Sequence, residues 1–187
     1  MLPVDSLPVM QMPPLPTSPT DERRFLKNIR NHAEFRRNLS DLSMVTDLPV
    51  FDGRVVAITG SWMKLGDEHV ADAMAAHAAG RNRAAYSRAY YAAYNASKAV
   101  RYHVNGAVSL KGDDHQAAPE LPDDFPDVDQ WSKLVAALYE HRLRADYDNW
   151  SNTASENTLA PNDCISQTQQ FLAECRQYLL HKFGVTL

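Results

Sequence analysis

The chain has 187 residues, enough for one ordinary domain with a hydrophobic core and too few for two of comfortable size. Its formal net charge of −4 excludes a globally basic protein, so any site for a polyanion has to be a local patch. The two cysteines are too few for a zinc site, and no metal site is predicted. No apolar run has the length of a membrane span and no secretory signal pattern opens the chain, so we expect a cytoplasmic protein that does not cross a membrane.

Residues 1–66 are predicted to form an N-terminal extension of the main domain. Residues 1–20 hold six of the eleven prolines and are expected to form an extended Pro-rich arm. Residues 21–39 follow a Ser-Pro pair and are predicted to form a helix. Residues 45–66 contain the run V-V-A-I-T-G, which is typical of a strand and its glycine turn, so we expect a connector, a short strand or a local hairpin there.

The same run looks like the first strand of a dinucleotide-binding fold. That fold requires a complete glycine-rich turn, a helix and then further strands. Gly60 and Gly66 do not complete the turn, and the residues that follow have the period of helices. No dinucleotide and no other cofactor is therefore predicted.

Residues 67–187 are predicted to form a helical domain, with helices over 67–79, 80–105, about 127–150 and about 161–183. Short connections make neighbouring helices antiparallel, so the expected architecture is an all-α, antiparallel four-helix bundle. The helix over 80–105 is expected to be central, because alanines recur on one of its faces at helical steps. The connection over 106–130 is acidic and rich in proline, and we interpret it as a lid or as a solvated loop.

One arginine falls on an apolar stripe of the helix over 127–150. Arg142 lies at helical steps from Trp131, Val135 and Leu138, where an apolar residue is expected. Burying an unpaired guanidinium costs several kcal/mol, roughly, so a partner is required. Asp146, one turn further on, is predicted to be that partner, with Arg88 of the central helix as a third member of a buried polar network.

Two motifs with their spacing then point to a family. The stretches S-R-A-Y-Y-A at 87–92 and R-L-R-A-D-Y at 142–147 resemble the HEPN superfamily, specifically a subgroup with S-R-x-Y-Y-A and R-x-x-A-D-Y signatures. His115 is similar to a histidine that often follows the central helix in that subgroup. The resemblance covers residues 67–183. It implies a HEPN-like helical bundle that forms a homodimer, a nucleotidyltransferase partner, a place in a toxin–antitoxin or phage-defence module and, in active members, metal-independent cleavage of RNA.

The resemblance also exposes a departure that bears on catalysis. Active members carry an arginine and then, after four to six intervening residues, a histidine, so that the arginine holds the scissile phosphate and the histidine moves protons. Here Arg142 is followed at that distance by Tyr147. A tyrosine hydroxyl, with an ordinary pKa of about 10, is a poor general base at neutral pH. Arg142 and Tyr147 are the candidate catalytic residues, but the substitution argues against an enzyme.

Three functional hypotheses remain open at this point. The first is a HEPN-like protein without strong catalytic activity that binds RNA, a nucleotide or a partner protein. The second is a ribonuclease toxin that uses Arg142 at a dimer interface, with Tyr147 or a displaced histidine. The third is a helical adaptor with no nucleotide role. The residues expected to bind a ligand or to form the polar network are Arg88, Tyr91, His115, Arg142, Asp146 and Tyr147.

Overall fold

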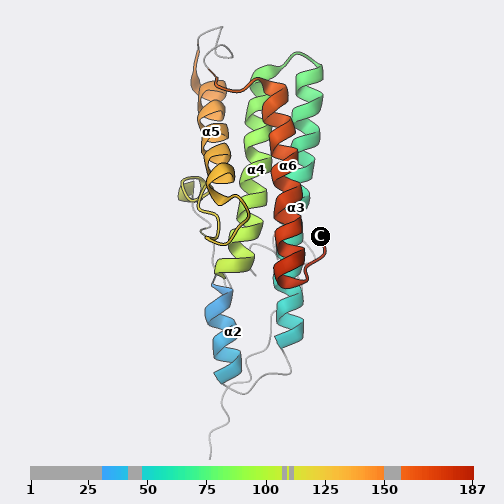
Figure 1. Ribbon diagram of the computed structural model, residues 1–187, viewed down its shortest axis with the longest axis vertical. Helices are drawn as coiled ribbons and strands as arrows, with labels where there is room; N and C mark the ends of the chain where they lie inside the picture. Colours follow the sequence, from blue (N-terminus) through green and yellow to red (C-terminus); the bar gives the residue numbers. More distant parts are fainter. Residues whose placement is uncertain (1–30, 42–47, 107–108, 110–111, 150–156) are drawn as a thin grey trace, which may run out of the picture.

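The computed structural model describes residues 31–41, 48–106, 109, 112–149 and 157–187. Its helices are α2 (His32–Asp41), α3 (Leu48–Ala78), α4 (Asn82–Asn105), α5 (Val128–Tyr147) and α6 (Pro161–Phe183), and a 3₁₀ turn, η2 (Gly112–His115), precedes α5. No β-strand occurs in these ranges. The long helices α3 to α6 form an antiparallel bundle in which α4 contacts the other three (Figure 1). The predicted all-α bundle is confirmed.

The position of α4 at the centre follows from its small side chains. Its five seam alanines are fully buried. Where α3 crosses this face it presents Gly66, and a Cβ added at that glycine would lie 3.3 Å from the carbonyl oxygen of Ala92. Small residues on both helices therefore set the close spacing of α3 and α4. The buried seam alanines are Ala85, Ala89, Ala92, Ala96 and Ala99.

The prediction for residues 45–66 is wrong where the structure describes them. Residues 48–66 are helical and belong to α3, so the predicted domain boundary at 66/67 falls inside one continuous helix. The β-branched run suggested a strand, but Phe51, Val55 and Ile58 are buried at helical spacing together with Trp62. Burial of this stripe against α4 and α6 outweighs the weak strand propensity of the individual residues. Residues 45–47 lie outside the described ranges.

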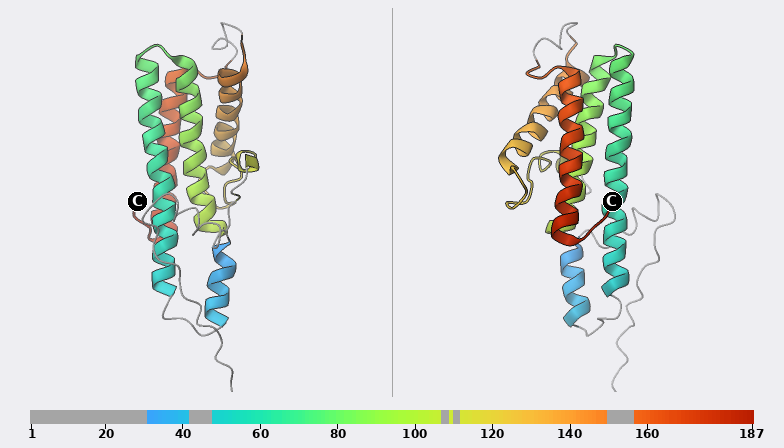
Figure 2. Two further views of the ribbon diagram at one scale, coloured as in Figure 1. Left: turned by 180° about the vertical axis from the view of Figure 1, so that it is seen from behind. Right: turned by 45° about the vertical axis from the view of Figure 1, so that its right-hand side comes forward.

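Of the predicted N-terminal helix over 21–39, residues 32–39 are helical in α2. Residues 21–30 and the predicted arm over 1–20 lie outside the described ranges. Figure 2 shows α2 alongside the first part of α3, beyond the end of α4. His32 packs on this end of the bundle, with Nε2 2.7 Å from the carbonyl oxygen of Tyr102, and Phe35 stacks on Phe51. No helix of the described ranges is long and apolar enough to span a membrane.

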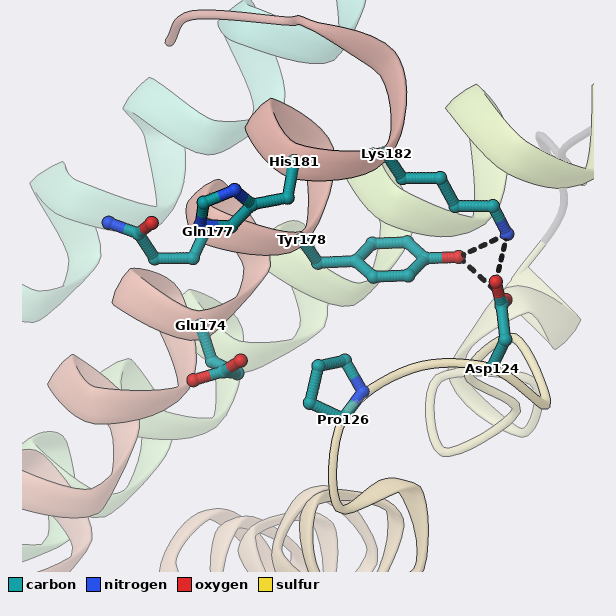
Figure 3. Close-up of a pocket in the computed structure, with 7 residues that line it drawn as sticks. All are labelled: Asp124, Pro126, Glu174, Gln177, Tyr178, His181 and Lys182. Atoms are coloured by element: carbon teal, nitrogen blue, oxygen red, sulfur yellow. Dashed lines mark hydrogen bonds and ion pairs between the residues drawn. The ribbon is translucent and has the colours of Figure 1, made fainter.

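The connection between α4 and α5 is packed against the bundle. Leu121 and Phe125 are buried, and Phe125 lies 4.9 Å from Tyr178 of α6, measured between ring centres. Figure 3 shows Tyr178 and Lys182 of α6 both meeting the carboxylate of Asp124, and the Tyr178 hydroxyl donates to it at 2.8 Å. The prediction of a solvated loop is therefore wrong for this stretch, because the acidic residues of the sequence masked its apolar anchors.

Candidate functional site

Tyr91, on α4, lies at the centre of the residues that the sequence singled out. Its hydroxyl lies 3.1 Å from Nη2 of Arg142, and the Arg142 guanidinium carbon lies 5.6 Å from its ring centre. The rings of His115 and His69 lie 6.0 Å and 5.7 Å from that of Tyr91. Elements α3, α4, α5 and η2 thus converge on one tyrosine. The Tyr91 cluster, as we call it, consists of His69, Arg88, Tyr91, His115, Arg142, Asp146 and Tyr147.

Arg142 is held on three sides. Its Nε lies 2.7 Å from Oδ2 of Asp146, so the predicted ion pair is present. Its guanidinium carbon lies 5.2 Å from the ring centre of Tyr147, on the same helix, in addition to its contact with Tyr91 of α4. The Arg142 side chain is 13% exposed, whereas Tyr147 is 71% exposed. The network therefore lies at the surface with a half-buried arginine, rather than inside the core as expected.

Arg88 does not join the Arg142–Asp146 pair. It is exposed on α4, and its Nη1 lies 3.4 Å from Nδ1 of His69 on α3. The neighbouring Ser87 takes the predicted place, with Oγ 3.4 Å from Oδ2 of Asp146. Successive residues of a helix point about 100° apart, so only one of the two can face α5. Arg88 thus lies at the α3 side of the Tyr91 cluster.

His115 lies on η2, far beyond Tyr91 in the chain, and still joins the Tyr91 cluster. Its Nδ1 lies 2.8 Å from the hydroxyl of Tyr90, and its ring lies 4.5 Å from that of Tyr94. Burial, and then the positive charge of Arg142, lower the pKa of His115 below its ordinary value. The imidazole is therefore neutral at pH 7 in the unliganded protein.

The segment that carries His115 is fixed by an acidic residue that sequence reasoning missed. The carboxylate of Asp114 is 1% exposed and lies 3.0 Å from Nζ of Lys98 and 3.1 Å from Nη1 of Arg101. The hydroxyl of Tyr94 also donates to it, at 2.8 Å. The sequence signal that could have indicated this contact is the pair Lys98 and Arg101, one turn apart on an otherwise buried face of α4. Buried cations require an anion.

A second missed residue is Arg83, at the start of α4. Its Nε donates to the carbonyl oxygen of Ala145 at 2.6 Å, and its Nη2 donates to that of Asp148. Ala145 lies in the last turn of α5, where backbone acceptors lack partners within the helix, and Asp148 is the residue that ends it. Arg83 therefore caps the end of α5 that carries Tyr147. No local pattern in the sequence indicated this contact.

His141 and His103 lie outside the Tyr91 cluster. His141 is buried and contacts Thr158, and His103 lies with Nδ1 3.3 Å from the hydroxyl of Thr59. Both cysteines are free thiols. No group of three or more His, Cys, Asp or Glu side chains in the described ranges is placed to hold a metal ion.

A family model described as the HEPN domain matches residues 59–178, well over half of the chain. The chain belongs to the HEPN family. The match contains every residue of the Tyr91 cluster and begins in α3, before the domain start that we predicted at 67. No curated protein and no solved structure matches the chain. The predicted membership of the HEPN superfamily is confirmed, and the narrower subgroup stays a prediction.

The geometry of this HEPN domain suits recognition of an anion better than proton transfer from α5. Arg142 has five N–H donors in a fixed plane. Nη2 donates to the hydroxyls of Tyr91 and Tyr147, whereas Nε lies against Asp146 as an ion pair and makes no hydrogen bond with the described residues. A guanidinium that is already orientated by two tyrosine rings and a carboxylate loses little side-chain conformational entropy when it binds a phosphate.

Proposed function

We propose that this HEPN protein binds RNA through the Tyr91 cluster, as part of a toxin–antitoxin or phage-defence module, without strong catalytic activity of its own. The observation that carries the proposal is the half-buried guanidinium of Arg142 between Tyr91 and Tyr147. Phosphate oxygens accept from such a fixed donor plane, and an exposed tyrosine ring offers a surface on which an unpaired base can stack. A homodimer and a nucleotidyltransferase partner are part of this proposal, since both accompany HEPN domains.

A ribonuclease at this site would need a side chain that transfers protons. Tyr147 follows Arg142 where active members have a histidine, and the described residues of α5 after Arg142 include no histidine. Binding needs only the cation and the aromatic surface, whereas cleavage also needs a group that ionises near neutral pH. The binding function is therefore the one that the side chains support best.

The first experiment measures binding and cleavage together. Fluorescence anisotropy with a labelled single-stranded RNA, in buffer free of divalent metal, is compared for wild type, Arg142→Ala and Arg37→Ala. Arg37 is an exposed arginine on α2, at the opposite end of the molecule, so Arg37→Ala removes the same charge elsewhere. Circular dichroism confirms that each variant is folded.

We expect Arg142→Ala to weaken RNA binding roughly tenfold or more and to lower the slope of log affinity against log salt by about one, because one phosphate contact is lost. Arg37→Ala is expected to bind as wild type does. Equal losses in both variants would mean a diffuse electrostatic effect. Wild type without affinity for RNA would favour the adaptor hypothesis, and cleavage that disappears in Arg142→Ala would make the protein a ribonuclease.

A further inference from the structure

The position of His115 beside Arg142 suggests more than a supporting role. His115, on η2, is far in sequence from the other residues of the Tyr91 cluster. Its ring nevertheless lies against the ring of Tyr91, as the guanidinium of Arg142 does. The clamp at Asp114 fixes the backbone one residue before His115. The imidazole is therefore a preset part of the site rather than a passing surface residue.

The hydrogen bonding of His115 allows either charge state. Burial raises the pKa of Tyr90, so this tyrosine keeps its proton and can donate it to Nδ1 at 2.8 Å, which leaves the ring proton on Nε2. If the ring takes a second proton, Nδ1–H can donate to the same oxygen after the hydroxyl rotates. Protonation of His115 thus breaks no hydrogen bond, and Nε2–H is a donor in both states.

Burial first, and then the charges that face His115, lower the pKa of its imidazole and favour the neutral form while no anion is bound. Arg142 and Lys98 disfavour a second positive charge there. Asp114 favours one, but its carboxylate is already shared by Lys98 and Arg101. A phosphate beside Arg142 would reverse this balance. The titratable and charged groups that face His115 are Tyr90, Tyr91, Tyr94 and Lys98 of α4, Tyr139 and Arg142 of α5, and Asp114 of its own segment.

We propose that His115 is a second phosphate-binding side chain of the Tyr91 cluster and takes up a proton when the RNA backbone binds. The inference rests on the proposed function and adds regulation to it: affinity is coupled to pH. Since the bound state holds one more proton, RNA affinity rises as the pH falls through the range in which His115 titrates. For one coupled proton the change is at most about tenfold per pH unit.

The test measures the dissociation constant of the labelled single-stranded RNA at constant ionic strength between about pH 8 and about pH 5.5, the range around histidine titration. Wild type is compared with His115→Gln, and His181→Gln, an exposed site on α6, is the matched control. We expect wild type and His181→Gln to bind at least about threefold more tightly at the acidic end. His115→Gln is expected to lose most of this dependence.

Other outcomes separate the two proposals. RNA binding in wild type whose pH dependence survives in His115→Gln would overturn the role of His115 and leave the proposed function standing. Dependence that disappears instead in His69→Gln, the other imidazole against Tyr91, would overturn it too. No RNA binding at any pH would overturn both proposals.

A second readout uses the wild-type protein alone and so does not depend on how His115→Gln folds. The pKa of the His115 imidazole is followed by NMR with and without RNA. We expect the pKa to rise when RNA is bound. An unchanged pKa in saturated protein would overturn the coupling.

Discussion

His141 shows how a single side chain can matter to the site without belonging to it. It is 1% exposed, and its Nε2 accepts a hydrogen bond from the backbone N–H of Thr158 at 3.2 Å. Its Nδ1 lies 3.5 Å from the sulfur of Cys164 in the first turn of α6. The residue next to Arg142 is therefore a link between α5 and the start of α6, and burial lowers the pKa of its imidazole.

Replacing this link should destabilise the fold. We expect His141→Ala to lower the free energy of unfolding by roughly 2–4 kcal/mol, because it opens a cavity and removes the acceptor of the Thr158 N–H. His181→Ala, at an exposed position of α6, is expected to change it by less than about 0.5 kcal/mol. Urea unfolding followed by circular dichroism measures both. If the two variants unfold alike, His141 does not link the helices.

At the scale of elements, buried ion pairs fix the connection between α4 and α5 against the bundle. Asp114 pairs with two cations of α4, and all three side chains are nearly excluded from solvent. Lys98 also lies over the ring of Trp62, 5.3 Å from its centre, which ties the pair to α3. This clamp fixes η2, and with it His115, against the bundle.

Removing the carboxylate charge should therefore be costly. Asp114→Asn leaves Lys98 and Arg101 buried without an anion, and we expect a loss of about 3–5 kcal/mol in the free energy of unfolding. Asp123→Asn removes the same charge from an exposed position of the connection and is expected to be nearly neutral. Chemical denaturation compares the two. A small effect at Asp114 would mean that water reaches the two cations and that the clamp contributes little.

The whole molecule should respond to pH through its histidines. Burial is the main cause that lowers the pKa of five of them in the folded protein. Such groups bind a proton in the unfolded chain at a pH where the folded protein does not. Their neutral forms therefore contribute stability that is complete above the ordinary histidine pKa of about 6.5 and is lost as the pH falls below it. The five histidines are His32, His69, His103, His115 and His141.

We expect the free energy of unfolding to fall between about pH 7.5 and about pH 5.5. A separate loss is expected below about pH 4. Burial alone would raise the pKa of Asp114, but Arg101 and Lys98 outweigh it and hold that pKa below its ordinary value, so its contribution persists until the carboxylate is protonated. Urea midpoints at a series of pH values and constant ionic strength test this. A profile that is flat across the histidine range would contradict it.

Much of the fold could be predicted because helices carry a local signal. Periodicity alone predicts the alanine seam of α4, the stripe of Trp131, Val135 and Leu138 on α5, and the range of α6. The pair Arg142–Asp146 was also local, since it spans one helical turn. The run over 55–60 was wrongly predicted because its strand-like composition is a weak preference, and the burial that overrides it depends on α4 and α6.

The amino-acid sequence by itself determined the helices from residue 67 onward, their antiparallel order and the HEPN motifs on α4 and α5, because each depends on residues within a few turns of one another. Only the tertiary structure decided that Ser87 rather than Arg88 faces Asp146, and that Arg83 caps α5. It also decided that the ion pairs of Asp114 hold His115 against Tyr91. These contacts join residues far apart in the chain. Their geometry is set by how the helices pack, and no local periodicity encodes that.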